Sequence, residues 1–175
     1  KLTRALPAGE QQAVVLLIAG AASMKSYRAE NRLMQYSGAN FEGFEAGTIA
    51  PDKYYFGSKL ITTGIAYTSA AEQKPQHWSD LEKSDYKGMI VMPSPLYSGA
   101  AAYLLSGFVA NDSLGWKFFD ALKENEVVSV RGNGAVLKSI ASGEKPYGVL
   151  VDFMALNAKA KGSPVEFVFP EEGVP

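Results

Sequence analysis

Short apolar runs alternate with segments of helical spacing along most of the chain after residue 88. Continuous or alternating apolar runs predict strands, and apolar residues every three or four positions predict helices. Strands are expected at Met89–Met92, Val127–Val130, Tyr147–Val151 and Val165–Phe169. Helices are expected at Gly99–Val109, Leu114–Lys123, Gly132–Ser142 and from Asp152 to about Lys161, and a short helix or turn at Trp78–Tyr86. Asn111-Asp112-Ser113 is expected to cap the helix at Leu114–Lys123. Because strand and helix alternate with short connections, we expect an α/β lobe with a largely parallel sheet.

The first third of the chain carries a weaker pattern of the same kind. Ala13–Ile18 is a continuous apolar run that predicts a buried parallel strand, and Met24–Leu33 has helical spacing. The polar, glycine-rich region up to Gly47 predicts a loop. Tyr54–Gly57 and Lys59–Tyr67 form a long β-prone stretch, rich in aromatic and β-branched residues. Because this stretch is longer than a usual strand, it predicts a crossing between two lobes.

Composition excludes several classes of protein and site. The chain has 175 residues, of which 47% are hydrophobic and 20% charged, and its net charge is −1. This balance is ordinary for a globular protein and gives no electrostatic reason to expect nucleic acid or an anionic membrane as partner. The absence of cysteine excludes a disulfide scaffold, a thiolate metal site and a cysteine nucleophile, and the single histidine, His77, excludes a His-pair metal site.

The junction between the strand at Met89–Met92 and the following helix is the strongest candidate site. Its loop runs from Pro93 through Ser98 and Gly99 into an alanine-rich helix. A helix start offers unpaired backbone N–H groups and the positive end of the helix dipole, which suit an anion. Ser98 adds a hydroxyl, and Gly99, followed by Ala100, lets a ligand approach the backbone. The alternative is that Ser98 only caps its own helix.

Three other junctions lie at the carboxyl ends of predicted strands, where ligands bind in open α/β sheets. They carry Ser23, Asn133 (within Gly132-Asn133-Gly134) and Asp152. Neutral donors at two junctions and a carboxylate at the third would suit a small ligand with one anionic end and one cationic or hydroxylated end. Each has a plain alternative, because Asp152 is a common helix cap and Asn133 a common turn residue. The glycine pair lacks the third glycine of a GxGxxG motif.

Four further polar residues are weaker candidates for ligand contacts. Thr62 and Thr63 lie in the crossing stretch, and Glu171 and Glu172 lie near the end of the sequence. The threonines are alternatively ordinary strand residues, and the glutamates a solvated charge pair. No Ser–His–Asp arrangement can be built around His77, so we expect no catalytic residues.

Several segments together resemble the periplasmic solute-binding proteins of ABC importers. Tyr55–Tyr67 is similar to the segment where these proteins first cross between lobes, and Tyr86–Pro95 followed by Ser98-Gly99-Ala100 resembles their anion-binding turn. Further matching segments are Gly143–Gly148, Ala158–Val165 and Pro170–Gly173, so the resemblance covers nearly all of the chain from about Ala13 onward. It implies the type II periplasmic-binding-protein-like architecture, in which two α/β lobes close on a ligand.

The resemblance also bears on the ligand, since the group includes binders of ferric ion, polyamines, 2-aminoethylphosphonate and sugar phosphates. Its ferric members bind iron with two adjacent tyrosines at the junction that is Asp152-Phe153-Met154 here. Neither Phe153 nor Met154 can supply a phenolate, whereas the Ser-Gly-Ala turn is intact. The resemblance therefore implies an organic phosphate or phosphonate at this turn, with Asp152 and the Glu171-Glu172 pair binding an ammonium or sugar hydroxyls. An iron(III)-binding transport protein stays an alternative.

Members of this family are typically much longer, so the resemblance implies that lobe one is incomplete here. We expect residues 1–58 to be part of lobe one, 59–165 to form lobe two with the first crossing strand, and 166–175 to return toward lobe one. Since Lys1–Arg4 is not followed by the apolar segment of a signal peptide, we expect a mature form or an internal portion of a longer protein.

The implied partners are a small anionic solute and the membrane permease of an ABC importer. The resemblance implies a monomer in the periplasm, or outside the cell on a lipid anchor in a Gram-positive source. No enzymatic activity and no cofactor are expected. Two rivals stay open: an enzyme on the same architecture, which would need a nucleophile or an acid/base pair in the cleft, and a ligand-sensing module of a regulator or receptor.

Overall fold

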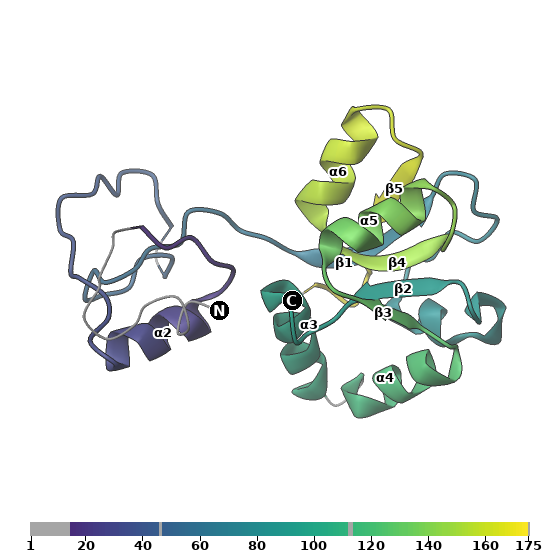
Figure 1. Cartoon of the computed structure of the whole chain (residues 1–175), viewed down its shortest axis with the longest axis horizontal. Helices are drawn as coiled ribbons and strands as arrows, with labels where there is room; N and C mark the ends of the chain where they lie inside the picture. The colour runs from purple at the N-terminus through teal and green to yellow at the C-terminus, as the bar shows by residue number, and fades with distance from the viewer. Residues whose placement is uncertain (1–14, 46, 112–113, 175) are drawn as a thin grey trace.

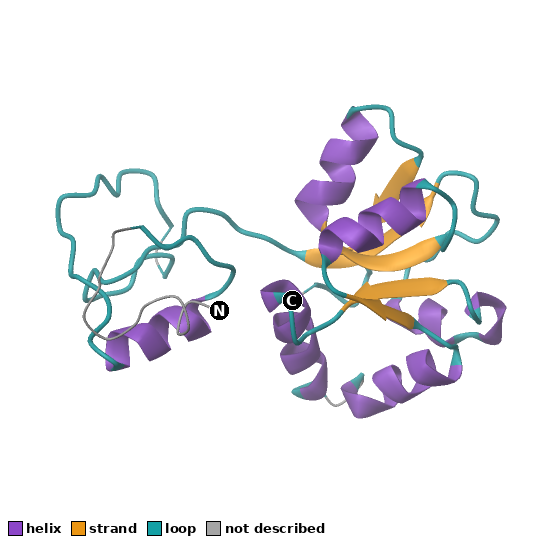
Figure 2. Cartoon of the chain, in the orientation of Figure 1, coloured by secondary structure: helices purple, strands orange, loops and turns teal. Residues whose placement is uncertain are grey.

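The computed structural model of the chain describes residues 15–45, 47–111 and 114–174. These residues form two bodies joined by an extended segment, residues 59–62 (Figure 1). We call residues 15–58 the small body and residues 63–174 the sheet body. All strands of the described chain belong to the sheet body, whereas the small body consists of one helix and loops (Figure 2).

A five-stranded sheet forms the centre of the sheet body, in the order β3-β2-β4-β1-β5. The strands are β1 (Thr63–Thr68), β2 (Ile90–Pro93), β3 (Val128–Val130), β4 (Tyr147–Val151) and β5 (Val165–Val168). β2 pairs in parallel with β3 and β4, whereas β1 pairs antiparallel with β4 and β5. The carboxyl ends of β2, β3 and β4 therefore share one edge of the sheet with the start of β1, where Thr63 pairs with Val151.

Helices cover both faces of this sheet (Figure 1). One face carries α3 (Gly99–Val109), α4 (Gly115–Glu124) and two short 3₁₀ helices, η1 (Trp78–Glu82) and η2 (Ser84–Tyr86), and the other carries α5 (Asn133–Ala141) and α6 (Asp152–Ala160). Each face has its own apolar cluster, and alternate strand residues enter alternate clusters. In β4, Val149 packs with the α3–α4 side and Leu150 with the α5–α6 side, as the two-residue period of a strand requires.

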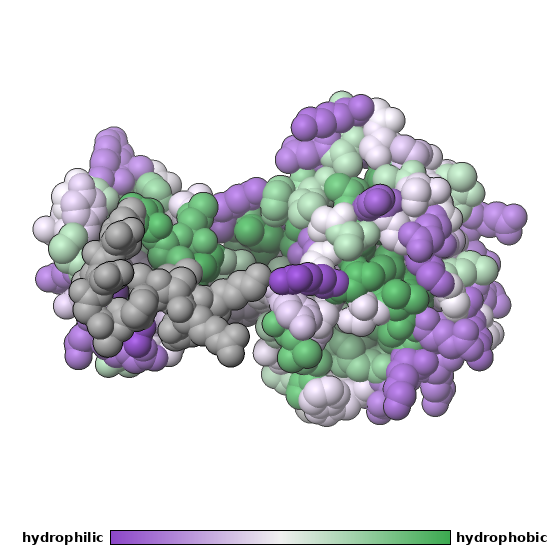
Figure 3. Space-filling view, viewed as in Figure 1, coloured by the Kyte–Doolittle hydropathy of each residue, from purple (hydrophilic) through white to green (hydrophobic). Residues whose placement is uncertain are grey.

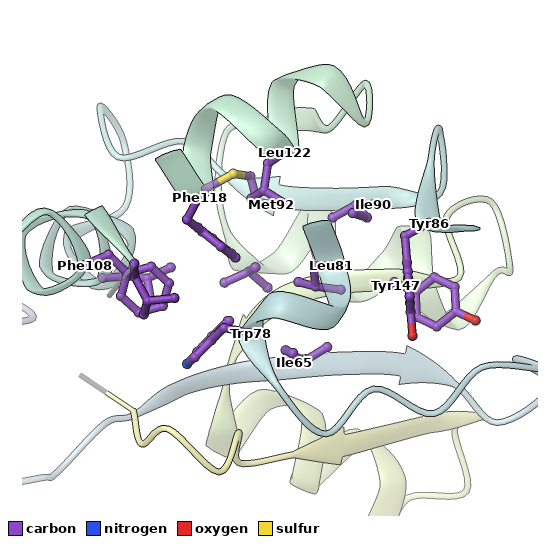
Figure 4. Packing of buried hydrophobic residues seen from close by; sticks show 13 residues of the cluster. Ile65, Trp78, Leu81, Tyr86, Ile90, Met92, Phe108, Phe118, Leu122 and Tyr147 are labelled. Atoms are coloured by element: carbon purple, nitrogen blue, oxygen red, sulfur yellow. The ribbon is translucent and has the colours of Figure 1, made fainter. Parts of the chain in front are cut away.

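The larger cluster, on the α3–α4 side, is rich in aromatic side chains (Figure 4). Trp78 is fully buried, and its ring centroid lies 4.9 Å from that of Phe108 and 6.2 Å from that of Phe118, both edge-on. The indole nitrogen of Trp78 donates to the carbonyl of Gly173 at 2.9 Å. This bond attaches the segment after β5 to the same cluster.

The small body has no comparable core. Its helix α2 (Ala21–Ala29) buries none of its residues, and Ala50 is the one buried hydrophobic residue among residues 15–58 that the structure describes. A minor cluster of Phe41, Phe44 and Phe56 is held by edge-on and tilted ring contacts. Much of its apolar surface faces outward, and hydrophobic atoms show on it beside the grey residues in Figure 3.

The predictions for the sheet body after residue 88 are confirmed to within one or two residues at each end. Gly99–Val109 and Tyr147–Val151 have the predicted bounds, and Asp152 begins α6 as expected. Four of the five strands run in one direction and β1 opposes them, which fits the expected largely parallel sheet. Asp112 and Ser113, expected to cap α4, lie outside the described residues.

Two strand predictions nearer the start of the chain are wrong. Val15–Ile18 adopts no regular secondary structure, and Val15 is 90% exposed. Ala13 and Val14, the rest of that predicted strand, lie outside the described residues. The stretch at Lys59–Tyr67 becomes a strand only from Thr63, and Tyr54–Gly57 contributes a single bridge between Ile49 and Phe56. An apolar, β-branched segment becomes a strand only where a second strand can pair with it.

The predicted helix at Met24–Leu33 is α2, shifted to Ala21–Ala29. The segment at Trp78–Tyr86 forms the two 3₁₀ turns η1 and η2. In the part of the chain that is described, none of the helices combines the length and the apolar character needed to cross a membrane.

Candidate functional site

Ser98 stands at the start of α3, where the loop after β2 turns into the helix. Its backbone is extended, and its hydroxyl accepts the N–H of Ala101 at 3.3 Å, so it is the N-cap. With an exposed fraction of 8%, Ser98 is nearly enclosed, whereas Gly99 after it is exposed and Ala100 is half-buried. The N–H groups of Gly99 and Ala100 belong to the first turn, which has no intrahelical acceptors. They are available to a ligand at this turn.

Asn133, the first residue of α5, fixes the orientation of the Ser98 hydroxyl. The backbone N–H of Val151 donates to Asn133 Oδ1 at 3.3 Å, so the other end of the amide must be the NH₂ group. That group donates to Ser98 Oγ at 3.2 Å. Ser98 Oγ thus accepts two hydrogen bonds, from Ala101 and Asn133, and both of its lone pairs are used. Its own proton remains free to be donated to an anion.

Asp152 lies at the end of β4, one residue after Val151. Its carboxylate accepts a hydrogen bond from Thr62 Oγ1 at 3.0 Å and one from the N–H of Phe153 at 2.6 Å. The backbone N–H of Asp152 in turn donates to the carbonyl of Thr62 at 3.0 Å. Asp152 is half-buried, and this double link ties the start of α6 to the segment that enters β1. Thr63, the next residue, is 3% exposed and belongs to the sheet.

A chain of contacts therefore runs along one edge of the sheet. It leads from Ser98 through Asn133 to Val151, and from the neighbouring Asp152 to Thr62. Neutral donors lie at one end and a carboxylate at the other. The structure brings together Ser98, Gly99, Ala100, Asn133, Asp152, Thr62 and Thr63 from the predicted set.

Two cations that the sequence reasoning missed flank this edge. The guanidinium of Arg131, two residues before Asn133, lies 5.3 Å from the ring centroid of Tyr97, which precedes Ser98. The ammonium of Lys59 lies 3.4 Å from the ring centroid of Phe153. Neither cation forms an ion pair within residues 15–45, 47–111 and 114–174. Both are attracted to an aromatic face, and no spacing motif in the sequence marks them.

The small body meets this site at the start of α2. A Cβ atom built on Gly99 would lie 3.3 Å from the carbonyl oxygen of Ala19, so the two backbones are close. Ser23, in the first turn of α2, is exposed. It lies one residue after Ala22, whose N–H donates to the hydroxyl of Tyr103 in α3 at 3.0 Å. Tyr103 is a further residue that the sequence reasoning missed.

Glu171 and Glu172 lie away from this edge. A carboxylate oxygen of Glu172 accepts the backbone N–H of Trp78 at 3.3 Å, and the ring of His77 lies 3.8 Å from Glu171 and 3.5 Å from Glu172. Glu172 also lines a shallow pocket with Phe108 and Asn111, at the far end of α3 from Ser98. The segment after β5 packs against η1, and this packing holds the two glutamates apart from Ser98.

The groups with clearly shifted pKa values lie elsewhere in the sheet body. Burial raises the pKa of Tyr86 to about 12. Burial alone would also raise the pKa of Asp80, but hydrogen bonds from Lys83 and from the backbone lower it to about 2. Tyr86 and Asp80 belong to the η1–η2 segment, where the Asp80 carboxylate accepts the backbone N–H of His77 at the start of η1. Their shifts follow from local structure.

The described residues contain no group of three or more His, Cys, Asp or Glu side chains that could hold a metal ion. Phe153 and Met154, which follow Asp152, instead line a shallow groove of about 290 Å³ on α6 together with Leu137 of α5. Their side chains offer no anionic oxygen to a hard metal ion.

The sequence as a whole now decides the family. The profile described as "Bacterial extracellular solute-binding protein" matches residues 14–174. The chain belongs to this family. The membership agrees with the predicted resemblance to periplasmic solute-binding proteins. Among curated proteins, none matches the chain.

Solved structures share the fold of this family member. The periplasmic binding protein P5PA is 25% identical, with a TM-score of 0.60 over 65% of this chain and 38% of its own. AfuA from Actinobacillus pleuropneumoniae, solved with exogenous fructose-6-phosphate bound, is 24% identical, with a TM-score of 0.64 over 85% of this chain and 50% of its own. The ferric binding protein from Campylobacter jejuni is 23% identical, with a TM-score of 0.66 over 85% of this chain and 53% of its own.

The chain thus spans about half the length of these proteins, between 38% and 53%. Their likeness confirms the predicted α/β, periplasmic-binding-protein-like fold of type II.

Proposed function

We propose that this chain captures a small anionic organic solute for an ABC importer, holding a phosphate or phosphonate group at Ser98, Gly99 and Ala100. The observation that carries the proposal is the free proton of the Ser98 hydroxyl. Both lone pairs of Ser98 Oγ are engaged by Ala101 and Asn133, so the hydroxyl has only a donor left to offer. A donor suits an anion and would be of no use to a cation.

The other groups at the turn support the same ligand class. The free N–H groups of Gly99 and Ala100 add donors, and the positive end of the α3 dipole favours negative charge. Arg131 lies beside the turn without an ion-pair partner among the described residues, so it can turn toward a bound anion at little cost. Together these groups match the several oxygens and the negative charge of a phosphate-type group.

Asp152 is the proposed contact for the opposite end of the ligand, where it would accept from an ammonium or from sugar hydroxyls. Its two hydrogen bonds, from Thr62 and from the N–H of Phe153, hold the carboxylate in place and leave further lone pairs free. Ser23 and Thr63 are weaker proposed contacts, from the small body and the crossing strand. Glu171 and Glu172 have no part in this site as proposed, since they pack beside Trp78.

The rest of the proposal concerns the whole protein. Residues 1–58 would belong to lobe one, 59–165 to lobe two and 166–175 to the return toward lobe one, with the ligand between the lobes. The partner would be the membrane permease of an ABC importer. The protein would act as a monomer in the periplasm, or outside the cell on a lipid anchor, without catalysing a reaction.

Iron(III) transport is the alternative function, because the ferric binding protein from Campylobacter jejuni shares the fold. It has less support from this chain. A hard trivalent ion requires several anionic oxygen ligands, and the junction after β4 offers Asp152 followed by Phe153 and Met154.

A ligand panel tests the proposal. Native mass spectrometry of the full-length protein as purified, followed by calorimetric titration, would compare 2-aminoethylphosphonate, fructose 6-phosphate, inorganic phosphate and ferric citrate. We expect binding of a phosphonate or phosphate ester without turnover. Binding of ferric iron alone, with a visible tyrosinate-to-iron absorption band, would overturn it, as would release of a reaction product in phosphorus NMR.

A further inference from the structure

An aromatic residue in the second turn of α3, Tyr103, connects the two bodies. The Tyr103 hydroxyl accepts the backbone N–H of Ala22 at 3.0 Å. Ala22 is in the first turn of α2, where the N–H groups have no intrahelical acceptor. The N-cap residue of α2, Gly20, has no side chain to cap them. Tyr103 therefore supplies from the sheet body the acceptor that α2 lacks in its own sequence.

The contact with Tyr103 requires a glycine at position 20. Its φ angle is +80°, in the left-handed region, and a Cβ atom built on it would overlap the ring of Tyr103. Gly99 repeats the pattern on the other side, where an added Cβ would lie 3.3 Å from the carbonyl oxygen of Ala19. Two glycines, one from each body, thus allow the segment before α2 and the start of α3 to approach each other.

Tyr103 is also placed to reach a ligand at the anion-binding turn. It lies four residues after Gly99, hence on the same face of α3, and helical side chains point back toward the N-terminus of their helix. Its hydroxyl has accepted one hydrogen bond, and nothing within the described ranges accepts its proton. The proton is therefore available on the side of the Ser98-Gly99 turn. Tyr103 is 43% exposed, so solvent and a solute can reach it.

We propose that Tyr103 is a closure residue, which holds the start of α2 against α3 and donates its proton to the anion bound at the Ser98-Gly99 turn. The ligand part of this inference rests on the proposed function. Ser98 and Tyr103 both belong to α3, so the differential affinity that closure requires comes from the N–H of Ala22. By donating to the Tyr103 hydroxyl, it orients and strengthens that hydroxyl as a donor to the ligand only while the bodies are together. Tyr103 then links occupancy of the sheet body to the position of the small body.

The first test removes the hydroxyl alone. In the full-length protein, Tyr103→Phe should weaken binding of the best phosphate-type probe of the panel by about tenfold, as expected for loss of a hydrogen bond to a charged group. Tyr36→Phe is the matched control, because Tyr36 is an exposed tyrosine whose backbone N–H bonds to Lys53 within the small body; it should bind as the wild type does. Equal affinity of Tyr103→Phe and the wild type would remove Tyr103 from the ligand site.

The second test obstructs the contact from the other side. Gly20→Ala should keep the bodies apart, and small-angle X-ray scattering should give a larger radius of gyration than for the wild type, with or without ligand. Gly43→Ala is the matched control, since Gly43 has the same kind of backbone, with φ +82°, and open space around its Cβ position. It carries the same backbone strain without the clash and should leave the scattering unchanged.

A double variant tests whether Gly20→Ala acts through Tyr103. Tyr103→Ala removes both the holding hydroxyl and the ring that the new methyl group meets, so it should itself enlarge the radius of gyration, and adding Gly20→Ala should change the scattering no further. Equal scattering of Gly20→Ala and Gly43→Ala would overturn the assignment of Tyr103 as a closure residue. If the wild type binds none of the probes, the proposed ligand class fails, and the scattering comparison still decides whether Tyr103 holds the bodies together.

Discussion

The sheet body and the small body differ in how they use apolar residues. In the sheet body, apolar runs pair as strands and pack under helices, so residues such as Ile65, Trp78 and Val149 are fully buried. In the small body, Val15 is 90% exposed, Leu17 83% and Met34 80%. The same kind of residue is thus a core residue in one body and surface in the other. Burial depends on whether a second layer is present, and composition alone does not supply one.

This contrast also bears on the site. The groups fixed by at least two hydrogen bonds, Ser98, Asn133 and Asp152, all lie on the sheet body. The small body contributes the start of α2, positioned through Tyr103. The sheet body thus holds a preformed part of the site, and the small body is brought to it. Ligand-driven closure uses this arrangement.

The largest difference in stability between the two bodies is expected at Trp78. Trp78→Ala should lower the free energy of unfolding of the 175-residue chain by about 3–5 kcal/mol, because it empties the centre of the aromatic cluster. Met34→Ala in the small body should change it by less than about 0.5 kcal/mol, as for an exposed side chain. Guanidinium denaturation followed by circular dichroism measures both. Similar losses for the two variants would show that the small body has a core after all.

Acid should act first on the sheet body, through Asp80. Burial alone would raise the pKa of Asp80, but hydrogen bonds from Lys83 and from two backbone N–H groups lower it from 3.8 to about 2. A pKa that is lowered on folding stabilises the fold above the unfolded value, and the stabilisation is lost as the pH falls from about 4 through about 2. We expect a loss of about 2 kcal/mol in that window.

Asp80→Asn is the variant that checks this. It should show the loss already at neutral pH and a flatter dependence of unfolding free energy on pH between about 4 and about 2, measured by urea denaturation at each pH. A slope as steep as that of the wild type would assign the acid sensitivity to other carboxylates.

Asn133 tests whether the sheet body prepares the anion site. Asn133→Asp keeps an acceptor for the N–H of Val151 but replaces the donor to Ser98 by a second carboxylate oxygen. The Ser98 proton would then be donated to the new carboxylate and not to the ligand, and the added charge would repel an anion. We expect affinity for the best phosphate-type probe to fall by at least about tenfold, or about 1.4 kcal/mol. Asn133→Ala should lose less, and the reverse order would contradict the assigned orientation of the amide.

The smallest effect is expected for an ion pair of the small body. Arg28 pairs with Asp52, and both side chains are well exposed, at 45% and 35%. Exposed pairs contribute about 0.2–1 kcal/mol, so Asp52→Asn should leave the unfolding midpoint nearly unchanged, with a still smaller change at high salt. A loss as large as that of Trp78→Ala would mean that this pair organises the small body.

Much of the sheet body could be predicted from the sequence, because its elements follow local patterns. The strand at Tyr147–Val151 and the capped helix at Ser98 can each be recognised from a few residues. The failures come from partners that a local pattern does not reveal. Val15–Ile18 has the pattern of a strand but no strand beside it, and Lys59–Thr62 is extended without a ladder.

The candidate site divides in the same way. Ser98, Asn133 and Asp152 could be found because each follows a strand. Their mutual contacts span 35 residues between Ser98 and Asn133 and 90 residues between Thr62 and Asp152, and only the folded sheet reveals them. Tyr103 could have been noticed as an aromatic residue in an alanine-rich helix, but nothing local points from it to Ala22, 81 residues away.

The most direct test of the proposed function is a calorimetric titration of Ser98→Ala with the panel's best phosphate-type ligand. The variant loses the Ser98 hydroxyl, whose proton is available to an anion, so binding should be weaker by about 1–3 kcal/mol, as for a charge-assisted hydrogen bond. Ser106→Ala, an exposed serine further along α3 whose hydroxyl bonds to the carbonyl of Ala102, serves as control and should bind normally. Unchanged affinity in Ser98→Ala would contradict the assignment of the α3 start as the anion site.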